Sequence, residues 1–213
     1  MIETIAAIAS ISILEVVLSI DNALVNASLA EKLPKSKQHK AIYTGIGLGA
    51  LLRVVVLLAA SVFLKNPIIK VLAALYLCYL SAANLITRKK GKKNKEKIKK
   101  HSGFFKVIVQ IVFTDLVFSI DNILGALGLS KNIWIVVIGV LIGIVGMLFV
   151  TQLMLFFMKR FPTLERTAYF IIAFIGLNLL AEVFFSIDIS KIVQFCVIVS
   201  MLSVSMLYDK IKS

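Results

Sequence analysis

Seven stretches of about 20 residues, almost free of charge, alternate along this sequence with short clusters of Lys and Arg. A helix needs about 20 apolar residues to cross a bilayer, so this alternation predicts consecutive membrane-spanning helices. The composition agrees, because 60% of the 213 residues are hydrophobic and the mean hydropathy is +0.98. The expected fold is all-α and polytopic, with seven helices over residues 4–30, 41–64, 67–87, 104–129, 132–158, 166–185 and 188–208.

The basic residues predict how these helices are oriented. If the N-terminus is outside, the inner side holds the run RKKGKKNKEKIKK over residues 88–100. It also holds Lys32, Lys35, Lys37, Lys40, Lys159, Arg160, Arg166, Lys210 and Lys212. The outer loops then hold only Lys65, Lys70, Lys131 and Lys191. Because basic residues gather on the cytoplasmic side, the predicted orientation is N-out and C-in.

The run 88–100 has a simple expected role as a topological anchor that contacts anionic lipid headgroups. We expect no nucleic-acid binding there, since no aromatic residue is interleaved to stack on bases. The inner basic loops and the absence of a transit peptide favour the cytoplasmic membrane of a bacterium.

An octad recurs in the sequence: EVVLSIDN over residues 15–22 and DLVFSIDN over residues 115–122. Each is an acid, three apolar residues and then Ser-Ile-Asp-Asn. The helix after each octad carries two glycines four residues apart, and the third helix of each set ends near a polar residue. These residues are Gly45, Gly49 and Asn84 in the first set and Gly139, Gly143 and Glu182 in the second.

These matches predict that the first three helices are repeated as the next three, with a seventh helix added. Because each repeat has three spans, an odd number, the second copy is expected to be inverted, as in many secondary transporters. We expect one transmembrane domain over residues 1–213. Its parts are the first repeat 1–87, a basic cytoplasmic loop 88–103, the second repeat 104–185, and the seventh helix with the C-terminus 186–213.

The octads place four carboxylates inside the predicted helices: Glu15, Asp21, Asp115 and Asp121. A carboxylate facing lipid costs about 2.5–3.5 kcal/mol at a helix centre, or about 10 kcal/mol for the four. They must therefore be neutralised, paired, or turned toward a cavity that holds water or a cation.

Helical geometry groups the polar residues of each octad. At about 100° per residue, Glu15, Ser19 and Asn22 share one face, and Asp21 lies about 120° away from Glu15. The second copy sets Asp115, Ser119 and Asn122 against Asp121 in the same way. Either the cavity spans a wide sector or the helices unwind at S-I-D-N. We favour unwinding, because Ser, Asp and Asn compete for backbone hydrogen bonds.

These carboxylates, amides and hydroxyls supply only oxygen ligands, which suit Mg²⁺, Ca²⁺ and Mn²⁺. Both histidines, His39 and His101, fall in predicted inner loops, which disfavours a zinc or copper site. Arg53, in the second helix, is either a counter-charge to the acids or a packing residue. Glu182 is a candidate for assisting proton or ion passage, with water access at a helix end as the alternative.

Several features have simpler interpretations. The two octads can form a structural hydrogen-bond network that locks two helices together. Cys78 and Cys196 are expected to be small core residues. A third S-I-D, over residues 186–188, is expected to cap the seventh helix.

The paired octads, the glycine-spaced second helices and the stretch FIGLNLLAE over residues 174–182 resemble the TerC family, within the LysE-like transporter superfamily. The resemblance covers nearly the whole chain. It implies a seven-helix exporter of divalent metal ions, Mn²⁺ above all, with Mn²⁺ as transported substrate rather than permanent cofactor. By motif position it implies that Glu15 and Asp21 are the acidic pair of the first half, and Asp115 and Asp121 that of the second. From the residues themselves, we expect these four acids to bind the metal and Asn22 and Asn122 to complete or orient its shell. Candidate accessory residues are Ser19, Ser119, Arg53 and Glu182.

Two other classes of function stay open. One is a membrane partner that helps other proteins insert or mature without transporting anything. The other is an intramembrane aspartyl protease, which is disfavoured because the G-x-G-D element of those enzymes is missing. We therefore expect no enzymatic activity, and no ATP-binding motif is present to drive transport directly.

Overall fold

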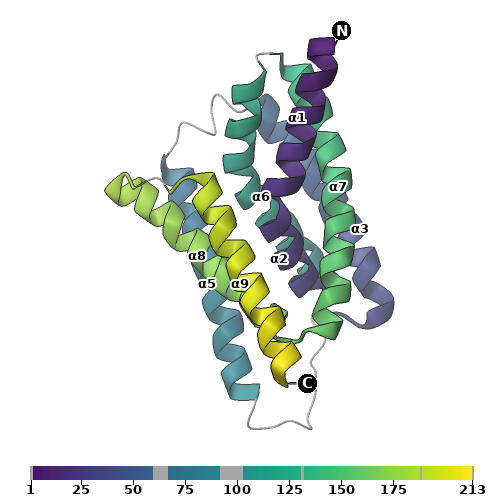
Figure 1. Ribbon diagram of the computed structural model, residues 1–213, viewed down its shortest axis with the longest axis vertical. Coiled ribbons are helices and arrows are strands. Elements are labelled where there is room, and N and C mark those ends of the chain that lie inside the picture. Colours follow the sequence, from purple (N-terminus) through teal and green to yellow (C-terminus); the bar gives the residue numbers. More distant parts are fainter. Residues whose placement is uncertain (1, 60–66, 92–102, 131, 188, 213) are drawn as a thin grey trace. The chain divides into compact units, whose positions relative to one another are not determined.

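The computed structural model describes residues 2–59, 67–91, 103–130, 132–187 and 189–212. Within these ranges all regular structure is helical (Figure 1). The helices are α1 (Ile2–Leu18), α2 (Ile20–Ala30), α3 (Lys35–Leu58), α5 (Pro67–Gly91), α6 (Phe104–Leu129), α7 (Ile133–Arg160), α8 (Thr163–Phe185) and α9 (Lys191–Lys212).

Among the described residues, α3, α5, α7, α8 and α9 are each long and apolar enough to cross a membrane. The pair α1 and α2 passes the same test when counted as one span bent by 50°. The protein is thus an all-helical membrane protein with five to six candidate spans. Several side chains of α6 lie outside the described set. The predicted count of seven spans, the orientation and the inversion of the repeats stay predictions.

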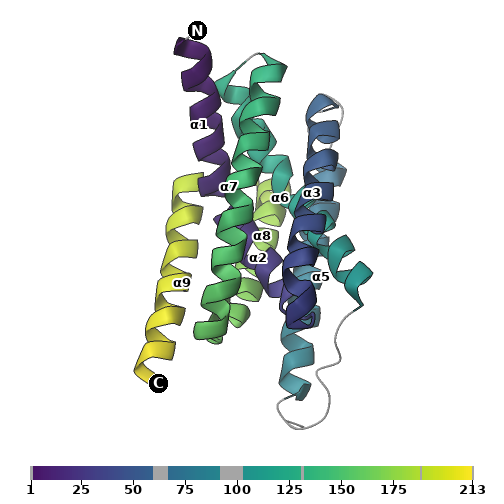
Figure 2. The same ribbon diagram turned by 90° about the vertical axis from the view of Figure 1, so that its right-hand side faces the viewer.

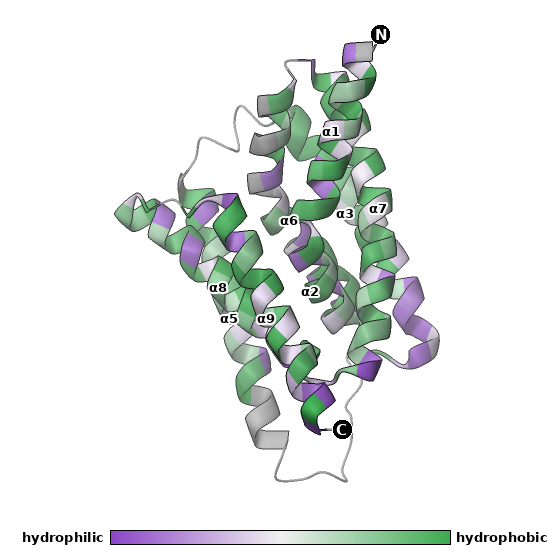
Figure 3. Cartoon of the chain, in the orientation of Figure 1, coloured by the Kyte–Doolittle hydropathy of each residue, from purple (hydrophilic) through white to green (hydrophobic). Residues whose placement is uncertain are grey.

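The surface and the interior have the polarity expected of a chain in lipid. Large apolar side chains are exposed on the helices, for example Phe149 with 73% and Ile192 with 76% of their surface. Figure 3 shows apolar residues along most of the helical length, with many polar residues toward the ends. The charged side chains of Glu15, Arg53 and Asp115 are buried instead. Such an arrangement fits burial in a bilayer, where apolar surface needs no cover and charge does.

The helix boundaries follow the predicted turn residues closely at some places. As expected, α5 begins at Pro67, a residue suited to the first turn of a helix. The predicted second helix, 41–64, begins earlier, because the chain turns at Pro34 and α3 starts at Lys35. Its predicted end, together with the basic run after Gly91, lies outside the described residues.

The interpretation of residues 186–188 as the cap of the last helix is wrong. Ser186 has φ 54°, the left-handed conformation that often ends a helix, and it terminates α8. The last helix α9 starts at Lys191 and not at 188. Ser190, immediately before it, accepts a 3.4 Å hydrogen bond from the Val193 amide and takes the capping place.

The described chain divides into two compact units that cut across the predicted repeats. One unit comprises Met1–Asn66 and Ser102–Leu155, and it contains the first two helices of each repeat. The other comprises Pro67–His101 and Phe156–Ser213, and it contains the third helix of each repeat together with α9. Below, the first is called the acidic unit and the second the α5–α8–α9 unit.

The acidic unit is built from two parallel helix pairs. Gly45 and Gly49 of α3 contact Ile111 and Asp115 of α6, so the contacts advance along both helices in the same direction. In the same way, Gly139 and Gly143 of α7 contact Ile11 and Glu15 of α1. Figures 1 and 2 show α1 and α6 running in opposite directions. Each glycine helix therefore packs on the acid-bearing helix of the other predicted repeat.

The α5–α8–α9 unit is held by small residues and hydroxyl contacts. Gly176 of α8 lies against Cys78 of α5, and Ser81 Oγ donates a 2.7 Å hydrogen bond to the Tyr169 carbonyl. The Thr167 and Ser205 hydroxyls, both buried, form a hydrogen bond between α8 and α9.

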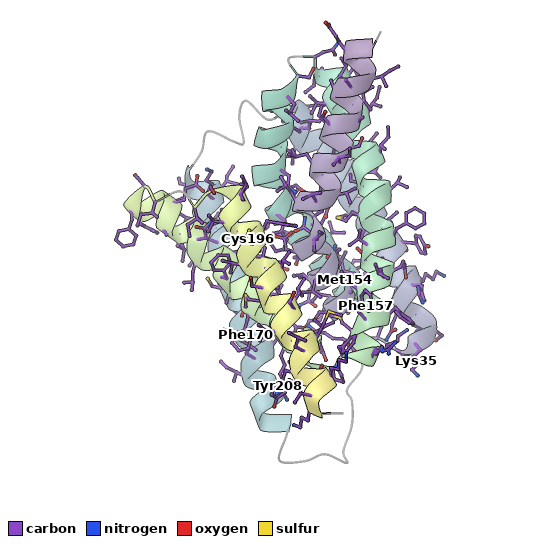
Figure 4. The ribbon with its side chains drawn as sticks, in the orientation of Figure 1. Lys35, Met154, Phe157, Phe170, Cys196 and Tyr208 are labelled. Carbon is purple, nitrogen blue, oxygen red and sulfur yellow. The ribbon has the colours of Figure 1, made fainter. Side chains whose placement is uncertain are left out.

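The two cysteines behave differently from each other. Cys78 is half-buried in the α5–α8 contact, in partial agreement with a packing role. Cys196 is exposed on α9, so its expected role as a core residue is wrong (Figure 4). Most of α9 is not buried: Tyr208 is also exposed, and only Ile198 and Ser205 are buried in this helix.

Candidate functional site

A buried ion-pair cluster lies at the centre of the acidic unit. The Arg53 guanidinium of α3 pairs through Nη1 with Glu15 Oε1 of α1 and through Nη2 with Asp115 Oδ1 of α6, the latter at 2.9 Å. All three side chains are at most 2% exposed. Of the two interpretations of Arg53, counter-charge or packing residue, the structure therefore supports the counter-charge.

Two glycines make room for the two carboxylates. A methyl group at Gly49 would lie 2.8 Å from Asp115 Oδ2, and one at Gly143 would lie 2.6 Å from Glu15 Cγ. Only glycine lets these helices approach so closely. The second glycine of each predicted pair thus leaves room for the first acid of the other octad: Gly49 for Asp115, and Gly143 for Glu15.

The octad residues predicted to share a face are buried together. In the first octad, Ser19 Oγ donates a 3.2 Å hydrogen bond to Glu15 Oε1, and Asn22 is fully buried beyond it. In the second, Ser119 Oγ donates to the Asp115 carbonyl instead, and Asn122 is also buried. The helical periodicity therefore predicted these two polar stripes correctly.

The backbone at S-I-D-N differs between the two copies: the predicted break occurs in the first, between α1 and α2, and is wrong for the second. Between α1 and α2 the axis bends by 50° at Ser19, yet its amide still bonds to the Glu15 carbonyl at 3.0 Å. Just after the bend, the backbone N–H of Asn22 donates to Asp21 Oδ1 at 2.9 Å. In contrast, α6 continues as a helix through residues 119–122. Because the four residues are identical, the packing around them must decide which copy bends.

Several buried polar atoms of the ion-pair cluster and of the Asn residues that end the two octads have no hydrogen-bond partner among the described residues. They are Arg53 Nε, Asp115 Oδ2, Asn122 Nδ2 and both amide atoms of Asn22. A buried polar group without a partner costs about 1–3 kcal/mol, so such a concentration needs an explanation. A ligand that offers and accepts polar contacts, such as a hydrated cation, supplies one.

The same accounting identifies two residues that the sequence analysis missed. They are Asn26, one turn after Asn22, and Ser28. Both side-chain amide atoms of Asn26 and the hydroxyl of Ser28 are buried and have no hydrogen-bond partner in the described part of the chain. Both lie on α2, where every residue from Asn22 to Ala30 is buried. The spacing of Asn22 and Asn26, four residues on one helix face, was the available signal.

The structure brings together only part of the predicted metal site. Glu15 and Asp115 meet on Arg53, whereas Asp21 is half-buried and the Asp121 side chain lies outside the described set. Within the described ranges, no group of three or more His, Cys, Asp or Glu side chains is close enough to hold a metal. The oxygen atoms Asp115 Oδ2 and Asn22 Oδ1, which have no described partner, nevertheless match the preference of a hard divalent cation.

Glu182, the remaining accessory candidate, belongs to the α5–α8–α9 unit. There its Oε1 accepts a 2.6 Å hydrogen bond from Lys70 Nζ, and both side chains are partly exposed. The pair joins α5 to α8, as expected of a contact near the helix ends.

Sequence comparison places these features among known membrane proteins. The chain matches the family described as "Integral membrane protein TerC family" over residues 2–213. It is 31% identical over 206 residues to the uncharacterized membrane protein YceF of Bacillus subtilis, covering 94% of this chain and 80% of the relative. YkoY of the same organism is 31% identical over 183 residues, covering 78% of this chain and 56% of the relative.

A third relative, the UPF0053 protein YegH of Escherichia coli, is 29% identical over 195 residues, covering 84% of this chain but 37% of its own length. The chain thus spans about four-fifths of YceF, just over half of YkoY and less than two-fifths of YegH. No solved structure matches the chain.

Proposed function

Because the chain belongs to the TerC family of integral membrane proteins, we propose that it is a secondary transporter that exports divalent metal ions, Mn²⁺ above all, across a bacterial cytoplasmic membrane. One observation carries the proposal. The acids that begin the two repeated octads, Glu15 and Asp115, meet in the core of the acidic unit on Arg53. Charged groups buried inside the helices of a membrane protein generally belong to an ion or proton path.

The charges of the two octads and Arg53 favour a cation as substrate. Four octad carboxylates against one guanidinium leave three net negative charges, and a divalent cation reduces these to one. An anionic substrate would be repelled. In this proposal the carboxylates of Glu15, Asp21, Asp115 and Asp121 bind the ion, while Asn22 and Asn122 complete its shell.

The pairing of the helices supports alternating access. Each glycine helix packs on the acid helix of the other predicted repeat. In this proposal the cluster therefore lies where two similar halves meet. A site between inverted repeats can be exposed to either side by rocking one half against the other. Protons that replace the metal on the carboxylates would compensate their charge during the return step, which makes proton antiport the expected coupling.

A second candidate is a structural polar network in a protein that assists the assembly of others. It is favoured by Arg53, which pairs with both Glu15 and Asp115 without any metal. Under this alternative, neutral replacements of the acids leave function intact as long as the helices remain packed.

Metal flux into proteoliposomes decides between the two. We expect Glu15→Gln and Asp115→Asn to abolish Mn²⁺ flux, with each variant still folded because Arg53 keeps one carboxylate partner. Asp21→Asn and Asp121→Asn are expected to do the same. Glu3→Gln is the matched control, since Glu3 is exposed at the start of α1 and should transport normally.

The flux assay should offer Mn²⁺, Mg²⁺, Ca²⁺ and Zn²⁺ in parallel, with and without a pH gradient. Native protein that moves none of these ions would overturn the transport proposal. Flux that ignores the pH gradient and moves no protons would overturn only the antiport.

A further inference from the structure

The two helix pairs of the acidic unit have the same contacts between glycine and acid, but they differ one helical turn later. Gly49 faces Asp115 in one pair, and Gly143 faces Glu15 in the other. Four residues further along the glycine helices, the first pair carries Arg53 and the second carries Met147, both fully buried. Only one half of the repeated structure therefore supplies a positive charge, and this charge serves the acids of both halves.

We propose that Arg53 is a built-in competitor of the transported cation: it holds the Glu15 and Asp115 carboxylates in the metal-free protein, and a divalent ion must displace it to bind. The inference rests on the proposed function, because it assigns a state of the same site.

The ion pairs of Arg53 leave some donors and acceptors of the same side chains without a partner in the described part of the chain, unlike a permanent structural salt bridge. A buried pair repays the cost of removing its charges from water only if the remaining donors and acceptors are also satisfied. Here Arg53 Nε and Asp115 Oδ2 have no partner among the described residues, and the buried Asn22 amide is in the same condition. The metal-free cluster therefore leaves acceptor oxygen atoms without a described partner, and a cation can take these oxygen atoms as ligands.

The surroundings also indicate which group moves. Glu15 is held by the Ser19 hydroxyl and by close contact with Gly143, and Asp115 lies in close contact with Gly49. The long Arg side chain has more rotatable bonds than either acid, and its Nε is not anchored to a described residue. Displacement of the guanidinium thus disturbs the packing less than displacement of a carboxylate.

A competitor of this kind has two consequences for transport. It keeps both carboxylates paired after the metal leaves, so the empty site holds less uncompensated charge in a low-dielectric interior. It also weakens metal binding, which favours release of the ion.

The test is Mn²⁺ binding to purified protein in detergent, with Arg53→Met copying the residue found in the other half. We expect the dissociation constant of Mn²⁺ to fall at least tenfold, and the turnover number in proteoliposomes to fall as well because release is slower. Lys70→Met is the control, since it removes one cation from the Lys70–Glu182 pair of the other unit and should leave Mn²⁺ affinity unchanged. An Arg53→Met protein that folds but binds Mn²⁺ no more tightly than the native chain would overturn the inference.

Arg53→Met leaves two buried carboxylates without their cation, so its folding has to be checked. If it does not fold, Arg53→Lys decides, because a single ammonium cannot make the forked contacts of a guanidinium with two acids. Affinity for Mn²⁺ should then rise by a smaller factor, and native or weaker affinity would contradict the inference. If the native chain itself neither binds nor transports a divalent cation, the proposed function fails independently of Arg53.

Discussion

Gly49→Ala isolates the contact that sets the position of Asp115. The added methyl carbon would lie 2.8 Å from Asp115 Oδ2 and 3.4 Å from its Cβ and Cγ. To restore an ordinary contact of about 3.4 Å, α3 and α6 must separate, or the carboxylate must retreat, by about 0.6 Å. The same carboxylate bonds to Arg53 at 2.9 Å, so this displacement also strains the ion pair.

Overpacking of a tight core typically costs about 1–3 kcal/mol, and we expect Gly49→Ala to lose stability in that range. The stability can be measured by unfolding in detergent, and the Mn²⁺ flux in proteoliposomes should fall at least tenfold. Gly47→Ala is the matched control on the same helix, because no described atom lies within 4 Å of a methyl group there. Its stability should stay native or rise by up to about 1 kcal/mol, since Ala favours helix over Gly.

The two readouts separate the packing argument from the functional one. A Gly49→Ala protein as stable as Gly47→Ala would refute the close approach of α3 and α6. One that is destabilised yet transports at the native rate would show that the position of Asp115 does not matter for transport.

Three further changes test other parts of the structure. Gly176→Ala should destabilise the α5–α8 contact, because its methyl would lie 2.9 Å from Cys78 Sγ, and Cys78→Ala should restore part of the loss; no rescue would contradict this contact. Thr167→Val and Ser205→Ala should each destabilise the protein, with a coupling of about 0.6–1.7 kcal/mol in a double-mutant cycle, whereas additive losses would deny the hydrogen bond. Asn26→Ala should leave stability native or higher, because it removes buried amide atoms without a described partner, while lowering Mn²⁺ flux; unaltered flux would place Asn26 outside the ion path.

Helical periodicity and the free-energy cost of exposing carboxylates to lipid predicted much of the acidic unit from the sequence. Glu15, Ser19 and Asn22 are buried on one face because a helix repeats every 3.6 residues and lipid excludes polar groups. The identity of the group that neutralises Glu15 and Asp115 required the structure, because Arg53 lies 38 and 62 residues from them along the chain.

Local sequence also failed where packing decides the backbone. S-I-D-N occurs twice, but the helix breaks and bends at Ser19 and continues unbroken through Ser119, so no rule based on those residues alone can predict both. Residues 186–188 were misassigned for a similar reason, since Ser186 adopts the left-handed conformation that closes α8.

The exchange of partners between the two halves limits how the chain can change over generations. Because Gly49 contacts Asp115 and Gly143 contacts Glu15, the space for each acid is controlled by a residue encoded in the other half. If a larger side chain replaces one of these glycines, the compensating change must occur at the acid that it contacts in the other half of the chain, and not at a neighbouring residue in its own half. If the predicted repeats are duplicates, the two halves are therefore expected to evolve as a pair, although the sequences around their shared motifs can diverge.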